Sequence, residues 1–175
     1  IKTGPGHLTL TAANTYDGGT TINEGTVEFT KINAMPTPGV VTVNDGTTLI
    51  VAVGGSGEWT TDASGNGTLG GLFAGLGGQA GSTLSFVGTS SLGLKVTGDQ
   101  VYSGVISSAG NVTVLGSGSL ELAGDNTFSG EIVIDGGATL ILSGDNSGAS
   151  SLIRIVNRYL QAEVANLPSR GAVTF

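Results

Sequence analysis

Residues 116–143 read GSGSLELAGDNTFSGEIVIDGGATLILS. In this stretch Leu120, Ile132 and Leu140 are each followed two positions later by a second large aliphatic residue. Apolar residues at every second position are typical of a short strand that buries one face, and the Gly, Asp, Asn and Ser residues between the pairs favour turns. The stretch therefore predicts three short β-strands separated by turns.

The same alternation continues along most of the chain. It recurs at Leu8/Leu10, Val27/Phe29, Val41/Val43, Leu49/Val51/Val53, Leu84/Phe86, Leu92/Leu94/Val96, Val112/Val114 and Ile153/Ile155. Only 11% of the residues are charged, so Thr, Ser and Asn must cover much of the surface. A chain of 175 residues built in this way is long enough to bury a core as one all-β domain.

The strand positions repeat with a period of about 20 residues. Leu120, Leu140 and Leu160 are each 20 residues apart, Val112, Ile132, Ile153 and Val173 are 20, 21 and 20 apart, and the pairs Leu8/Val27 and Ile22/Val41 are 19 apart. Two strand positions per period describe one coil, and stacked coils place equivalent strands about 4.8 Å apart. Because each coil needs a neighbour to bury its apolar face, this period predicts a right-handed parallel β-helix, or β-solenoid.

An antiparallel β-sandwich is the structural alternative, since it also contains short strands and frequent turns. Hairpins have no reason to keep a spacing of 20 residues over several periods, and Asn-Gly turns between matched strands are scarce. We therefore favour the solenoid.

Residues 54–83 are rich in glycine and lose the period, so we interpret them as an irregular excursion with Leu69, Leu72, Phe73 and Leu76 as apolar anchors.

One β-helix spanning residues 1–175 is the domain organisation that follows. It divides into a first repeat (1–53), the Gly-rich segment (54–83), linking coils (84–115) and a second, truncated repeat (116–175). Ile1 is not a natural start, so we expect the chain to be a piece of a longer protein.

The sequence has no cysteine, which excludes disulfides and thiolate metal sites. A net charge of −7 and the lack of a basic stripe argue against nucleic-acid binding.

The chain contains two copies of one motif, at residues 4–25 and 116–137. Nine positions are identical: Gly4, Gly6, Leu8, Leu10, Asn14, Thr15, Gly18, Ile22 and Gly25 recur as Gly116, Gly118, Leu120, Leu122, Asn126, Thr127, Gly130, Ile134 and Gly137. Tyr16 is replaced by Phe128. The pattern G-x-G-x-L-x-L-x-x-x-N-T-[YF]-x-G-x-x-x-I-x-x-G resembles the passenger-associated transport repeat, also called the autotransporter-associated β-strand repeat.

This resemblance implies a β-helical segment of a bacterial autotransporter passenger, exported by type V secretion to the cell surface or beyond. It implies a non-enzymatic structural role in which the segment assists passenger export and folding and extends a stalk. The implied partners are neighbouring coils and the C-terminal translocator barrel of a parent protein in the outer membrane. An adhesin-like module that binds host or cell-surface glycans or proteins is the alternative function.

The positions that the two copies share can be explained physically. Leu-x-Leu fills the inward columns, and stacked Asn14-type and Asn126-type amides form a ladder. We expect Gly18 and Gly130 to supply the positive φ that a corner needs. We also expect the aromatic residues Tyr16, Tyr102 and Phe128 to close corners of the core.

We assign no catalytic, cofactor-binding or metal-binding residue, and the sequence calls for no cofactor. His7, whose repeat partner is Ser119, is interpreted as an exposed strand residue rather than a catalytic base. Lys95, Arg154, Arg158 and the scattered acids form no cluster suited to glycan cleavage. Asp99, Asp125 and Asp145 recur in turns, where stacked carboxylates could bind Ca²⁺ but solvated turns are the simpler reading. Trp59 is interpreted as a packing residue, although an exposed Trp would suit a glycan.

Overall fold

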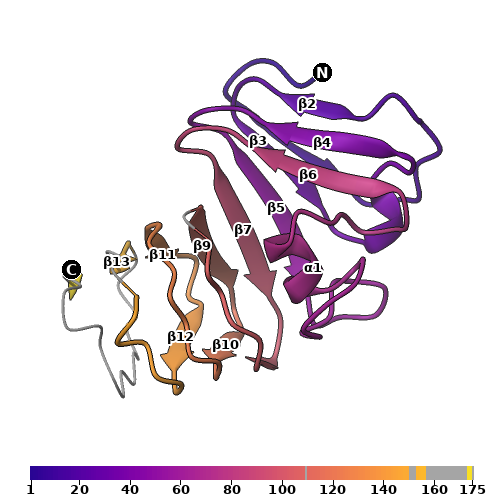
Figure 1. Cartoon of the computed structure of the whole chain (residues 1–175). Helices are drawn as coiled ribbons and strands as arrows, with labels where there is room; N and C mark the ends of the chain where they lie inside the picture. The colour runs from indigo at the N-terminus through magenta and orange to yellow at the C-terminus, as the bar shows by residue number, and fades with distance from the viewer. Residues whose placement is uncertain (109, 150–152, 157–172, 175) are drawn as a thin grey trace.

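The computed structural model describes residues 1–108, 110–149, 153–156 and 173–174, and the regular secondary structure of these ranges is almost entirely β-strand (Figure 1). Every pairing between named strands is parallel, which confirms the predicted β-solenoid and rules out the antiparallel sandwich. From β1 to β13, strands that neighbour each other in a sheet are separated in sequence by a strand of another sheet. The chain therefore winds through about seven stacked coils.

Eight strands form one long sheet that runs through the whole molecule. Their order is β1 (His7–Leu10), β3 (Thr26–Phe29), β5 (Thr48–Val53), β7 (Ser91–Val96), β9 (Asn111–Gly116), β11 (Ile132–Ile134), β13 (Ile153–Ile155) and β14 (Val173–Thr174). The register joins Leu8, Val27, Leu49, Leu92, Val112, Ile132, Ile153 and Val173 into one column. The spacing argument predicted the pair Leu8/Val27 and the run from Val112 to Val173, but it did not predict the place of Leu49 in the column.

Two smaller sheets close the core, one in each half of the chain. The N-terminal side sheet contains β2 (Thr20–Ile22), β4 (Gly39–Val43) and β6 (Ser82–Phe86), and lies at the upper right of Figure 1. The C-terminal side sheet contains β8 (Asp99–Tyr102), β10 (Ser119–Leu122) and β12 (Thr139–Leu142). Leu120 and Leu140 pair there as predicted, whereas Leu160 lies outside the described residues.

The pairing predicted between Ile22 and Val41 is wrong by two residues. Val41 lies beside Thr20, and Ile22 lies beside Val43. The shift keeps the same faces inward because side chains alternate with a period of two along a strand. The alternation therefore predicted the correct buried residues, but it could not choose between two registers that bury the same face.

The side sheets join opposite ends of the long-sheet strands. In the N-terminal half, the short turns 23–25, 44–47 and 87–90 lead from a side strand into a long-sheet strand. In the C-terminal half, the short turns 97–98, 117–118 and 135–138 lead from a long-sheet strand into a side strand. β7 has a short turn at both ends, so it is the coil at which one side sheet stops and the other starts.

The excursion is an insertion within a single coil. Leu49 and Leu92 are neighbours in the long sheet although they lie 43 positions apart, about twice the usual period. The inserted segment contains α1 (Leu69–Phe73), and a short 3-10 helix, η1 (Ile32–Ala34), lies in an earlier loop. In the described part of the chain, no helix is long and apolar enough to cross a membrane.

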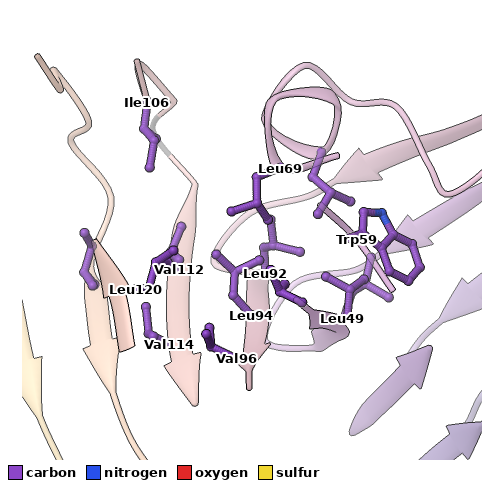
Figure 2. Close-up of a cluster of buried hydrophobic side chains, with 14 of the residues drawn as sticks. Leu49, Trp59, Leu69, Leu92, Leu94, Val96, Ile106, Val112, Val114 and Leu120 are labelled. Atoms are coloured by element: carbon purple, nitrogen blue, oxygen red, sulfur yellow. The ribbon is translucent and has the colours of Figure 1, made fainter. Parts of the chain in front are cut away.

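The anchors predicted for the excursion are largely confirmed. Leu69 and Leu72 are buried, and Phe73 and Leu76 are half-buried. Trp59 is completely buried, so its interpretation as a packing residue is confirmed. Figure 2 shows Trp59 and Leu69 beside Leu49 and Leu92 of the long sheet. The excursion therefore covers the core at the coil where it is inserted.

The inward columns lose their cover at the N-terminal end of the described coils. Leu120 is fully buried between Gln100 and Leu140, but its repeat partner Leu8 is 41% exposed because it has a neighbour on only one side. Tyr16 is exposed as well, whereas Phe128 is buried. Equivalent motif residues thus differ in burial according to whether a coil lies on both sides.

We expect Leu120→Ala to lower the free energy of unfolding by about 2–5 kcal/mol, because it opens a cavity between two stacked coils. Leu8→Ala should lower it by less than about 1 kcal/mol, because that side chain already contacts solvent. Urea unfolding of the two variants measures the difference. Equal losses would contradict the burial difference between the two copies.

Candidate functional site: the stacked repeat copies

The two motif copies build the same local structure. Each contains a Leu-x-Leu strand, a long loop carrying Asn-Thr-aromatic, a second strand and a short turn. In the first copy these are β1, loop 11–19, β2 and turn 23–25. In the second they are β10, loop 123–131, β11 and turn 135–138.

The sheets that the two copies occupy are exchanged. Leu-x-Leu lies in the long sheet in the first copy, at β1, but in a side sheet in the second copy, at β10. The second strand of the motif lies in a side sheet at β2 and in the long sheet at β11. The motif therefore specifies one coil and its turns, and the two copies lie on opposite sides of β7, where one side sheet stops and the other starts.

A buried asparagine ladder connects the long loops of the C-terminal half. The side-chain amide of Asn126 donates to Asn146 Oδ1 at 3.0 Å, and Asn126 Oδ1 accepts from the backbone N–H of Ile106 at 2.9 Å. Each asparagine also donates to the glycine carbonyl two residues before it, at 2.7 Å. Both asparagines are completely buried, so the ladder satisfies polar groups that water cannot reach. The predicted ladder is confirmed here.

Asn14 satisfies its loop in a different way. Its side chain donates to the backbone carbonyl of Ala34, one coil further on, at 2.6 Å. Its backbone N–H donates to the carbonyl of Asn33 at 3.1 Å. The motif asparagine thus links successive coils in both copies, but it stacks on a second asparagine only in the second copy.

Glycine permits the close approach of coils beside the ladder. A Cβ atom on Gly124 would lie 2.2 Å from the carbonyl oxygen of Gly104, and one on Gly144 would lie 2.2 Å from that of Gly124. The prediction for Gly18 and Gly130 is wrong, because neither has positive φ, whereas the first and the last motif glycine of each copy do. The last motif glycine is Gly25 (φ 71) in the first copy and Gly137 (φ 86) in the second, where the short turn needs a left-handed residue.

The aromatic residues do not share one role. Phe128 lies in a long loop, as does the exposed Tyr16. Tyr102 lies in β8 and pairs with Leu122, so it belongs to an inward column of the C-terminal side sheet. The predicted corner role is therefore wrong for Tyr16, which is exposed, and for Tyr102, whose place in the coil is that of a motif leucine.

The charged residues singled out in the sequence form pairs on the outer surface of the strands. His7 Nε2 lies 2.9 Å from Glu28 Oε2, and Lys95 Nζ lies 2.7 Å from Glu28 Oε1. Glu28 is only 3% exposed, and Lys95 reaches it across β5. This network links β1, β3 and β7. The alternation of apolar and polar residues predicts that Glu28 faces outward. It cannot show that the side chains of His7 and Lys95, from other strands, cover Glu28.

The remaining candidates are separated from one another. Arg154 pairs with Glu131 at 2.7 Å, and Arg158 lies outside the described residues. The backbone N–H of Asp145 donates a hydrogen bond to Asp125 Oδ1 at 3.0 Å. Asp99 lies in a different part of the coil, where it accepts a hydrogen bond from the Ser119 hydroxyl. Among the residues that the structure describes, no three His, Cys, Asp or Glu side chains gather in a way that could hold a metal ion.

One acidic residue outside the motif joins successive short turns. Asp45 Oδ1 accepts hydrogen bonds from the backbone N–H of Thr89 at 2.7 Å and from the Thr89 hydroxyl at 2.8 Å. The hydrogen bond from the Thr89 N–H makes the larger contribution and the one from the Thr89 hydroxyl the smaller. Together they hold the pKa of Asp45 below its ordinary value of 3.8. Asp45 thereby connects the coils on either side of the excursion.

Comparison with known proteins agrees with this arrangement. The model of the Passenger-associated-transport-repeat family matches residues 1–29 and 112–138, which contain both motif copies. Two segments of the chain are thus similar to the passenger-associated transport repeat. The repeat associates the chain with autotransporter passengers, and together with the solenoid it supports a structural role. Neither the curated proteins nor the solved structures that were searched contain a match.

We expect Asn126→Ala to lower the free energy of unfolding by about 1–3 kcal/mol, because it removes the hydrogen-bond partner of the Ile106 N–H and of Asn146 Oδ1 in a buried place. Asn44→Ala is the matched control, since it removes an exposed hydrogen bond to Asn23. That control should change stability by less than about 0.5 kcal/mol. Similar effects of the two variants in urea unfolding would show that the ladder contributes little.

The lowered pKa of Asp45 makes the stability of the fold depend on pH in the acid range. Because the folded-state pKa of Asp45 is lowered, its contribution to stability is present above the ordinary pKa and is lost as pH falls through the folded-state value. The stability difference between the wild type and Asp45→Asn should therefore shrink when pH falls from about 5 to about 2.5. Unfolding midpoints measured across this range provide the test, and a difference independent of pH would contradict the assignment.

Proposed function

We propose that this chain is a non-enzymatic structural segment of a bacterial autotransporter passenger, displayed at the cell surface or released from it. In this role it extends the passenger as a stalk and assists export, because each coil that emerges offers a template for the next. The observation that carries the proposal is the continuous long sheet, in which every described coil is hydrogen-bonded to its neighbours.

The repeat copies supply the features that such a template needs. Their inward leucines extend the apolar columns, and their asparagines satisfy loop polar groups through the next coil. Folding of a solenoid can propagate from coil to coil because each coil contacts only its neighbours. Outside the inner membrane no ATP is present, so this stepwise folding is a source of free energy for export.

The burial of Trp59 weakens the adhesive alternative. That residue was the aromatic side chain best suited to stack on a sugar ring, and it is completely buried in the core. A glycan would therefore have to find another platform on this chain.

The experiment uses the parent protein that contains this segment, expressed in its own export system. Leu120→Asp together with Leu122→Asp should lower the amount of passenger displayed on intact cells, since two buried positions of one coil become charged. Glu121→Gln, at the outward position between them, is the control and should leave display unchanged. Display is measured by antibody labelling of intact cells, normalised to total passenger.

Unchanged display of the double variant would overturn the export role. Normal display combined with lost adhesion per displayed molecule would favour the binding module. Adhesion is measured on the same cells, so one experiment distinguishes the export role from the binding module.

A further inference from the structure

The exchange of side sheets at β7 leaves an inward column of the N-terminal side sheet unfinished. Ile22, Val43 and Phe86 are register neighbours on β2, β4 and β6. Ile22 and Val43 are completely buried, but Phe86 is 36% exposed. No described strand follows β6 in that sheet, because the chain continues from β7 into the C-terminal side sheet. An inward-facing aromatic ring is therefore left without a neighbour on the next coil.

A cavity lies where that neighbour would be. Its volume is about 150 Å³, and its apolar walls come from Leu72 and Phe73 of α1, Phe86 of β6, Leu92 of β7 and Val112 of β9. Ser108 and Asn111 also line it. An apolar cavity of about this size accommodates a ring such as benzene. The missing coil thus leaves room for one aromatic ring.

A second, more polar hollow adjoins the first, because Phe73 and Ser108 line both. Its volume is about 340 Å³, and its lining includes Tyr102, Val105 and Ser107. The rings of Phe73 and Tyr102 lie 5.7 Å apart at an angle of 53°. Within the described residues, the hydroxyl groups of Tyr102, Ser107 and Ser108 donate no hydrogen bond, so they are available to a ligand.

The charge of the lining defines the ligand further. No Asp, Glu, Lys, Arg or His lines either hollow. A charged ligand would lose hydration without gaining a partner of opposite charge, which is costly. An anion would in addition meet the overall negative charge of the chain, −7.

We propose that these two adjoining hollows form a binding site for a small uncharged aromatic molecule that carries a hydroxyl group. The ring occupies the apolar cavity between Phe73, Phe86 and Leu92. The hydroxyl group points into the second hollow and forms hydrogen bonds with Tyr102, Ser107 or Ser108. The site is created by the exchange of side sheets, so it belongs to this chain and not to the repeat motif, whose residues do not line it.

Benzyl alcohol is the probe, with toluene and benzoate as comparison ligands. Methyl NMR signals of Leu72, Leu92 and Val112 should shift with saturation at a dissociation constant of about 1 mM. The methyl signals of Val27, buried at the far end of the long sheet, should stay unchanged. Toluene, without the hydroxyl group, should bind several-fold more weakly, and benzoate should give no saturable shift.

Two variants locate the site. Ser108→Phe places a ring between the two hollows and should abolish the shifts, and Phe86→Ala removes a wall and should weaken binding at least about tenfold. Val40→Ala, an exposed position on β4 away from both hollows, is the control and should bind as the wild type does. If Ser108→Phe does not fold, Phe86→Ala decides alone.

Absence of saturable shifts in the wild type would overturn the proposal. So would equal binding of benzoate, or binding that Phe86→Ala leaves unchanged. None of these results bears on the export role, which is read from display of Leu120 and Leu122 variants on cells.

Discussion

Stacking of each coil on the next is the constraint on which the rest of this structure depends. A single coil of about 20 residues has too few side chains to enclose a core, so its inward residues are buried only when coils lie on both sides. The contrast between Leu120 and Leu8, identical in motif position and opposite in burial, follows directly from this. The buried asparagines obey the same rule, since Asn126 finds its partners one coil before and one coil after itself.

The repeat motif encodes a coil and leaves its sheet assignment open. Both copies form a strand, a long loop, a strand and a short turn, but their strands lie in different sheets. The exchange takes place at β7, which has a short turn at each of its ends. Such a change costs little in a solenoid, because every strand position has an inward face that any coil can extend. It also leaves a place where one column ends, and this is where α1 and the two hollows lie.

Much of the fold could be predicted from residues whose pattern repeats. The alternation at Val112, Ile132 and Ile153 and the spacing between them predicted both the parallel pairing and the register. What could not be predicted depends on contacts between distant segments. No local pattern shows that Leu92 follows Leu49 in the long sheet, or that Lys95 covers Glu28. Positive φ was assigned to Gly18 and Gly130 although Gly25 and Gly137 carry it, because the spacing does not show where a turn bends.

The insertion of the excursion within one coil can be tested directly by cross-linking, because the chain contains no cysteine. Thr48 and Ser91 are register neighbours on β5 and β7, so cysteines at these two positions should form a disulfide under mild oxidation. An uninterrupted period of 20 residues would instead place Thr68 beside Thr48. We expect a disulfide in Thr48→Cys with Ser91→Cys and none in Thr48→Cys with Thr68→Cys. A disulfide only in the second variant would contradict it.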